Sequence, residues 1–134
     1  MEIVLYHGSK NEFDEFDLSM SKDGCAYGRG FYCSNDLSIG RQYSGMKDPY
    51  VLKIECQNPF IVDLDVSYEE MLERNRAFRP NRGARERLID MGHDAVLIKQ
   101  GDYVEMVVFH PEMIENLGRG SSLDLEDVAP AFNR

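Results

Sequence analysis

The chain has 134 residues, a formal net charge of -9 and no apolar run long enough to cross a membrane. Its length suits one domain that buries roughly 68% of its unfolded surface. Its N-terminus lacks the basic region and apolar core of a signal peptide, so we expect a cytoplasmic protein that does not act at a membrane. The negative charge disfavours binding driven by nucleic-acid phosphates and favours a macromolecular partner with a basic patch.

The N-terminal segment predicts a strand followed by an irregular stretch. Residues 3–6 are rich in β-formers and end at His7, so we expect a strand that delivers His7 to an edge or a cleft. Residues 11–20, with aromatic side chains among acidic ones, predict a loop or a short helix. Glycines then precede Phe31, where they permit backbone geometry or a close ligand approach that a side chain would block. These glycines are Gly24, Gly28 and Gly30.

One helix and two strands are expected next. Asn35 or Asp36 can cap a helix over residues 37–43, which places Tyr43 on its last turn. Two segments separated by Gln57-Asn58-Pro59 predict strands, and these are residues 50–55 and 60–63.

The middle of the chain predicts two helices. Ser67 and Glu70 have the spacing of a capping box, and an apolar stripe follows the same helical period. The stripe consists of Tyr68, Met71, Leu72 and Phe78. A second helix is expected over residues 81–91, with Gly92 ending it.

The last third of the chain predicts two buried strands. Residues 95–98 and 104–109 are continuous apolar segments, and residues 99–102 are expected to connect them. Residues 111–117 then close the domain.

From Gly118 onward the chain is polar, glycine-rich at its start and then acidic. We therefore expect a domain of residues 1–117 and a tail of residues 118–134 that is mobile or becomes ordered on a partner. Strands on both sides of a helical middle favour an α+β fold with a split, mostly antiparallel β-sheet.

Four motifs in this framework carry chemically capable side chains. They are Leu5-Tyr6-His7-Gly8-Ser9, Gly28-Arg29-Gly30-Phe31-Tyr32-Cys33, Tyr43 and Glu105. Glu105 stands inside an apolar run and must face solvent, a cleft or a partner, because burying an unpaired carboxylate is costly. Taken singly, His7 also suits a strand-end histidine bonded to backbone, and Tyr32 and Tyr43 also suit core aromatics.

In this order and spacing, the motifs resemble the His-Tyr-Glu branch of the ADP-ribosyltransferase superfamily, which includes poly(ADP-ribose) polymerases and diphtheria-like toxins. The resemblance is closest to small bacterial and phage-associated domains of polyvalent phage proteins, and it spans about residues 3–117. Further stretches that carry it are Phe13-Asp14-Glu15-Phe16-Asp17, Gly92-His93-Asp94-Ala95 and residues 105–114. It implies an ADP-ribosyltransferase-like split sheet and NAD as the substrate.

Transfer from NAD needs flat apolar faces for the nicotinamide ring, backbone partners for its amide and a carboxylate beside the developing positive ribose. The resemblance implies that Tyr32 and Tyr43 bracket the ring and that Gly8 holds the amide through its backbone. Glu105 would hold the 2′-hydroxyl and stabilise the transition state, and His7 would hydrogen-bond the adenosine ribose. The implied catalytic set is Glu105, His7 and Tyr32, and the implied cofactor-binding set is His7, Gly8, Ser9, Gly30, Tyr32 and Tyr43.

Two positions depart from the family pattern. Gly40 stands where polymerases commonly carry a serine that donates a hydrogen bond to the carboxamide. Either Ser44 or Ser38 supplies this hydrogen bond instead, or the nicotinamide is held less firmly. Tyr103 stands where arginine-specific transferases carry an acid or a glutamine, which disfavours arginine as the acceptor.

No metal site is expected. The three cysteines Cys25, Cys33 and Cys56 lack a C-x-x-C spacing, which argues against a disulfide framework and a structural zinc site and favours small buried side chains. His93 and His110 belong to no convergent pattern of ligands. NAD is thus the expected small molecule.

The sequence favours an NAD-dependent mono-ADP-ribosyltransferase, toxin-like or phage-associated, that modifies a macromolecule. The negative charge favours a protein acceptor over nucleic acid and also allows a neutralising partner protein. Two alternatives stay open: a catalytically weak NAD-binding or interaction module of the same fold, and an NAD glycohydrolase. Retention of Glu105 with both tyrosines favours the transferase.

Overall fold

The computed structural model describes residues 1–12, 27–67, 69–70, 73 and 83–123, and the sheet among them has seven strands in the order β4-β5-β6-β2-β1-β3-β7. The β4–β5 pair is parallel and the other pairs are antiparallel, so the expected α+β fold with a mostly antiparallel sheet is confirmed. The strands are β1 (Glu2–His7), β2 (Phe31–Ser34), β3 (Tyr50–Glu55), β4 (Pro59–Asp63), β5 (Ala95–Gln100), β6 (Tyr103–Val108) and β7 (Ile114–Arg119). The helices are α1 (Leu37–Tyr43), α3 (Ala84–Asp90) and the 3₁₀ turn η2 (Pro111–Met113).

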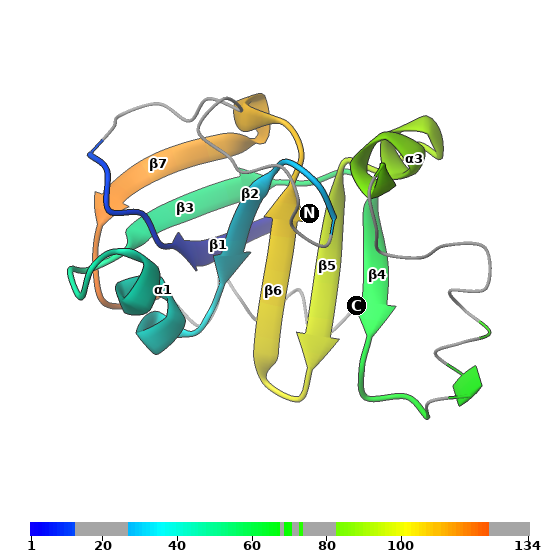
Figure 1. Cartoon of the computed structure of the whole chain (residues 1–134), viewed down its shortest axis with the longest axis horizontal. Coiled ribbons are helices and arrows are strands. Elements are labelled where there is room, and N and C mark those ends of the chain that lie inside the picture. Colours follow the sequence, from blue (N-terminus) through cyan, green and yellow to red (C-terminus); the bar gives the residue numbers. More distant parts are fainter. Residues whose placement is uncertain (13–26, 68, 71–72, 74–82, 124–134) are drawn as a thin grey trace.

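The sheet is split at its centre, between β1 and β2. In the described part of the chain these two strands pair at Tyr6 and Ser34 alone, whereas β1 pairs with β3 along its whole length. Figure 1 shows the result: β1, β3 and β7 run across the direction of β2, β6, β5 and β4. His7 therefore ends an interior strand and not an edge strand, and it lies at the split.

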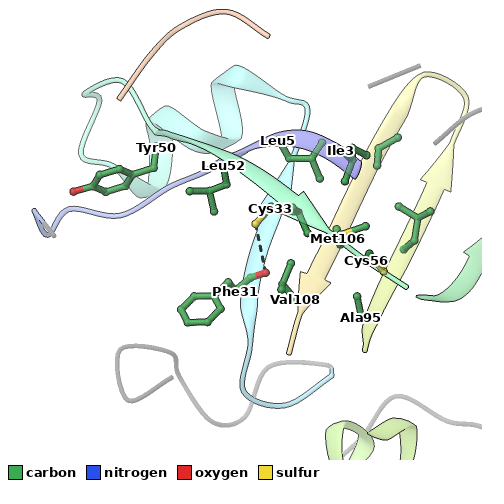
Figure 2. Packing of buried hydrophobic residues seen from close by; sticks show 13 residues of the cluster. Ile3, Leu5, Phe31, Cys33, Tyr50, Leu52, Cys56, Ala95, Met106 and Val108 are labelled. Atoms are coloured by element: carbon green, nitrogen blue, oxygen red, sulfur yellow. Dashed lines mark hydrogen bonds between the residues drawn. The ribbon is translucent and has the colours of Figure 1, made fainter. Parts of the chain in front are cut away.

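The main hydrophobic core lies between the two halves of the sheet. Alternate residues of β1 and β3, such as Leu5 and Leu52, meet alternate residues of β2 and β6, such as Cys33 and Met106, and all four are buried. Figure 2 shows these side chains directed toward one another from strands of both halves. The two-residue period of the strands thus assigns one face of every strand to this core.

A second apolar cluster covers the other face of the β4-β5-β6-β2 half. Ala84 and Leu88 of α3 pack there against Val96 and Val107, with Tyr32 at the cluster's margin. A helix covering one sheet face while the opposite face meets another layer is the usual solution for an α+β domain. None of the described helices is long and apolar enough to span a bilayer.

Several expected element boundaries shift in the structure. α3 begins at Ala84, because Gly83 has φ 84° and cannot belong to a right-handed helix. Residues 81 and 82, where the sequence places the start of this helix, lie outside the described residues. β5 continues through Gln100, and its Lys99 pairs with Asp63 of β4, so the turn before β6 consists of Gly101 and Asp102 rather than residues 99–102.

The other expected elements that fall on described residues are found, with ends that shift by a residue or two. The strands expected at 3–6, 50–55 and 60–63 are β1, β3 and β4, and the strand expected at 104–109 is β6. Ser67 accepts a hydrogen bond from the Glu70 backbone N–H at 3.2 Å, as expected for a capping box. Residues 13–20 of the segment expected at 11–20, the four residues of the apolar stripe and Cys25 lie outside the described residues. Cys33 and Cys56 are buried, as expected, and their thiols are free.

β7 extends the sheet past residue 117, where the sequence places the end of the domain. Tyr50 pairs with Arg119 and Leu52 with Asn116, so Leu117 and Gly118 together oppose one residue of β3. Gly118 has φ 92°, the left-handed backbone that a bulge of this kind requires of its glycine. The glycine that predicts a tail therefore forms a β-bulge inside a strand, and the rest of the expected tail from residue 124 lies outside the described residues.

We expect a chain that ends at Leu117 to be less stable than one that ends at Leu123 by about 2–4 kcal/mol, because the shorter chain loses the hydrogen bonds of a half-buried arginine. Arg119 donates to the carbonyls of Asp48 and Ser9, and the Gly120 N–H donates to Pro49. Urea unfolding of the two truncated chains measures the difference. Equal midpoints and slopes would show that the sheet does not depend on the end of β7.

Candidate active site

The candidate site begins where β1 and β2 separate. His7 ends β1, and its Nδ1 lies 2.9 Å from the backbone carbonyl oxygen of Tyr32 in β2. The ring of His7 also meets the ring of Phe31 edge-on, at a centroid distance of 6.3 Å. The histidine thus joins the two halves of the sheet at the split.

The hydrogen bond and the burial of His7 define its chemical state. Burial lowers the pKa of His7 below its usual value, and the hydrogen bond to Tyr32 opposes this shift without reversing it. A carbonyl can only accept, so Nδ1 carries the hydrogen, and in the neutral ring Nε2 is an acceptor. Nε2 of His7 is thus suited to accept a hydrogen bond from a hydroxyl group.

Gly8 follows directly and is packed against the end of α1. A Cβ at Gly8 would lie 2.6 Å from the carbonyl oxygen of Gly40 and 2.6 Å from the Cβ of Tyr43. No side chain can be accommodated at these distances, so glycine at position 8 is a requirement of the helix packing. The same packing brings the backbone of Gly8 beside Tyr43.

Helix α1 is set in place by its N-cap and by a buried serine at its other end. The Asp36 carboxylate accepts from the backbone N–H groups of Ser38 and Ile39, as expected for the capping residue. At the C-terminal end, the buried Ser44 accepts through its Oγ from the backbone N–H of Ser9 at 3.1 Å. The helix therefore carries Tyr43, 65% exposed, on its last turn as expected.

Gly40 has a steric reason to be glycine. A Cβ there would lie 2.8 Å from both Cβ and Cγ of Pro49. Of the two serines proposed as substitutes, Ser38 donates its hydroxyl to Asp36 at 2.7 Å and Ser44 holds the backbone of Ser9. Both hydroxyls thus have local roles in shaping the site.

Glu105 of β6 lies on the sheet face opposite the main core. It is in register with Ser34 of β2, and its carboxylate accepts from the Tyr103 hydroxyl at 3.2 Å. Burial, and then the Glu105 charge, raise the pKa of Tyr103 to about 12, and the Ser34 hydroxyl bonds to the same phenol. Tyr103 therefore stays protonated and acts as a donor to the carboxylate near neutral pH.

Two more tyrosines lie near this carboxylate. Tyr32 shares the face of Glu105, because Tyr32 and Ser34 are two residues apart on β2 and Ser34 pairs with Glu105. Its hydroxyl donates to the carbonyl of Gly28 at 2.9 Å and accepts from the N–H of Tyr27. Burial, and then the Glu105 charge, raise the pKa of Tyr27. Glu105 is thus a half-buried carboxylate among phenol rings.

The structure groups the predicted site residues into two neighbouring sets. One set, at the end of β1 and on α1, contains His7, Gly8, Ser9 and Tyr43, and the other, on β2 and β6, contains Tyr32 and Glu105. The His7 ring follows Leu5 on the face of the main core, whereas Tyr32 and Glu105 use the opposite face. The backbone of Tyr32 links the sets, since its carbonyl receives the His7 hydrogen bond.

Gly30 is placed by packing between strands. A Cβ at Gly30 would lie 2.8 Å from Cγ1 of Val107 and 2.9 Å from the carbonyl oxygen of Val108, so this glycine lets β2 approach β6. Its contribution to a ligand site stays a prediction.

Sequence reasoning did not assign three residues that the structure puts at the site: Ser34, Tyr103 as a partner of Glu105, and Arg119. Strand alternation could have found Tyr103, because residues two apart on a strand share a face. Within the described ranges, no three His, Cys, Asp or Glu side chains gather as metal ligands.

The chain matches a known protein family. A family model described as "ADP-Ribosyltransferase in polyvalent proteins" matches residues 1–119. The match covers both sets of site residues and ends at the last residue of β7. No curated protein matches the chain.

We expect Gly40→Ser to destabilise the fold by about 1–3 kcal/mol, the usual cost of forcing extra atoms into a packed site. Pro49 leaves no room for the new Cβ, and α1 would have to move away from the end of β1. Helix propensity alone predicts the opposite sign, a gain of about 0.5 kcal/mol. Urea unfolding distinguishes the two, and a stabilised variant would contradict the packing argument.

Proposed function

Because this chain belongs to the ADP-ribosyltransferase domains of polyvalent proteins, we propose that it is an NAD-dependent mono-ADP-ribosyltransferase that moves ADP-ribose from NAD to a macromolecular acceptor and releases nicotinamide. The observation that carries the proposal is the environment of Glu105. A strand carboxylate in hydrogen-bond contact with a protonated tyrosine, on the face shared with Tyr32, is suited to stabilise positive charge on a ribose.

In the proposed mechanism, the glycosidic bond between ribose and nicotinamide breaks first, and positive charge grows on the ribose. The Glu105 carboxylate stabilises that charge and accepts a hydrogen bond from the ribose 2′-hydroxyl. Tyr103 donates to one carboxylate oxygen, Oε2, and so fixes the orientation of the group. Nicotinamide leaves as a neutral molecule with the electron pair of the broken bond. The nucleophilic atom of the acceptor then attacks the ribose carbon and releases its proton to water.

The residues at the end of β1 are proposed to hold NAD. The backbone of Gly8 pairs with the carboxamide, and the exposed ring of Tyr43 stacks on nicotinamide together with Tyr32. Nε2 of His7 accepts from an adenosine ribose hydroxyl, in agreement with the tautomer that the Tyr32 carbonyl selects. Ser9 and Gly30 are proposed to complete this set.

The acceptor is proposed to be a protein. The net charge of -9 repels nucleic-acid phosphates and attracts a basic protein surface. Tyr103, where arginine-specific relatives carry an acid or a glutamine, supplies no carboxylate to an arginine acceptor. A phage-associated, toxin-like role with a neutralising partner, in the cytoplasm, agrees with these features and stays a prediction.

Incubation with labelled NAD and a cell lysate tests the activity. Transfer predicts label on intact proteins together with free nicotinamide, and mass analysis then identifies the acceptor residue. Nicotinamide release without labelled protein would instead favour the glycohydrolase. NAD binding with neither product would favour the binding module.

We expect Glu105→Gln to lower transfer by about two to three orders of magnitude, because the variant loses the charge that opposes the developing positive ribose. NAD binding and the fold should change little, since glutamine keeps an acceptor for Tyr103. Glu115→Gln, on the exposed side of β7, makes the same change of charge away from the site and serves as the control. Near-normal transfer by Glu105→Gln would contradict the mechanism.

We expect Tyr43→Ala to weaken NAD binding by about 1–3 kcal/mol, the range for stacking a ring on an aromatic side chain. Tyr43→Phe keeps the ring and should bind NAD almost as the wild type does. Because Tyr43 is 65% exposed, neither change should alter stability much. Calorimetric titration with NAD measures both, and equal losses in the two variants would assign the role to the hydroxyl instead.

A further inference from the structure

Arg119, the last residue of β7, anchors the segment that follows His7 and Gly8. Its Nη2 donates to the backbone carbonyls of Ser9 at 3.0 Å and Asn11 at 3.2 Å, and its Nε donates to the Glu12 carboxylate at 3.1 Å. Nη1 donates to the carbonyl of Asp48 at 2.7 Å. One side chain thus holds residues 9–12 against the end of the edge strand β7, where Arg119 is in register with Tyr50 and Tyr50 with His7.

The Arg119 guanidinium also stacks on the ring of Tyr50. Its central carbon lies 4.3 Å from the centroid of the Tyr50 ring, and the Arg119 side chain is 18% exposed. The Tyr50 hydroxyl donates to the Asn11 carbonyl at 3.0 Å, so Tyr50 holds both Arg119 and the segment. A planar, forked donor stacked on an aromatic ring is a role that lysine cannot fill.

The segment needs such an anchor because strand pairing stops before it. β1 ends at His7, and beyond this point Ser9 is held from two sides: its N–H donates to Ser44 of α1, and its carbonyl accepts from Arg119. Gly8 lies between β1 and this fixed peptide. The geometry of the Gly8 backbone is therefore set by β1 on one side and, on the other, by Ser9, which Ser44 and Arg119 hold.

We propose that Arg119 is a positioning residue for the NAD site. It acts through the backbone of residues 9–12 and holds Gly8 in the orientation that binds the carboxamide; this role rests on the proposed function of the site. Positioning of this kind matters because a displacement of about 1 Å at a binding group can cost roughly a hundredfold in rate. Arg119 does not itself contact the reacting atoms.

Arg119→Met tests the role, since methionine keeps apolar contact with Tyr50 and removes every donor. Lys53→Met is the control, because Lys53 pairs with Glu2 on the same half of the sheet, away from residues 9–12. Hydrogen exchange of the amides of residues 9–12 is measured without NAD, and the NAD dissociation constant is measured by calorimetry. Tyr50→Phe, which removes one hydroxyl and keeps the ring, is the second variant in case Arg119→Met does not fold.

We expect Arg119→Met to speed exchange at residues 9–12 and to weaken NAD binding by roughly ten- to a hundredfold, the range for losing one well-placed hydrogen bond to the carboxamide. We expect smaller changes of the same sign in Tyr50→Phe and none in Lys53→Met. Arg119→Lys should not restore affinity. If the amides of residues 9–12 exchange at the wild-type rate in Arg119→Met, Arg119 does not anchor this segment. If they exchange faster but NAD binds with wild-type affinity, Arg119 does not position the NAD site. If the wild-type protein does not bind NAD, the proposed function and the role of Arg119 both fail. The wild-type titration is done first, so this outcome is distinguished from a failure of the Arg119 proposal alone.

Discussion

The site depends on the split between β1 and β2. In the described part of the chain these strands share one register pair, Tyr6 with Ser34, and then diverge. The divergence lets the two halves of the sheet enclose the main core, and it leaves the end of β1 without a strand ladder on that side. Polar contacts take over there: His7 bonds to the Tyr32 carbonyl, and Ser9 bonds to Ser44. Two residues proposed to bind NAD, His7 and Ser9, thus make the polar contacts that replace strand pairing at the end of β1.

Close backbone approaches make this junction possible. Gly8 and Gly40 let α1 lie against the end of β1, and Gly30 lets β2 lie against β6. The approach of α1 to β1 fixes the position of Tyr43, and the approach of β2 to β6 fixes that of Tyr32. Glu105 belongs to the same arrangement, because β6 brings it beside Ser34 at the split. Rigid elements rather than free loops therefore carry most of the proposed site.

Local signals in the sequence predicted much of this fold. The cap at Asp36, the strand that ends at His7 and the carboxylate within an apolar strand all depend on neighbouring residues, and short patterns express them. Arg119 could not be found in this way, since its partners Ser9 and Asp48 are 110 and 71 positions away. Gly118 predicted a tail because glycine suits a loop and a β-bulge equally, and the pairing of β3 with β7 decides between them. The roles of the site residues came from family resemblance and stay predictions.

A crystal structure of the protein with NAD would show whether the split in the sheet is the substrate site. We expect the nicotinamide amide at the backbone of Gly8, the ring against Tyr43 and the adjoining ribose beside Glu105. NAD bound elsewhere, with the ends of β1 and β2 unoccupied, would contradict this expectation.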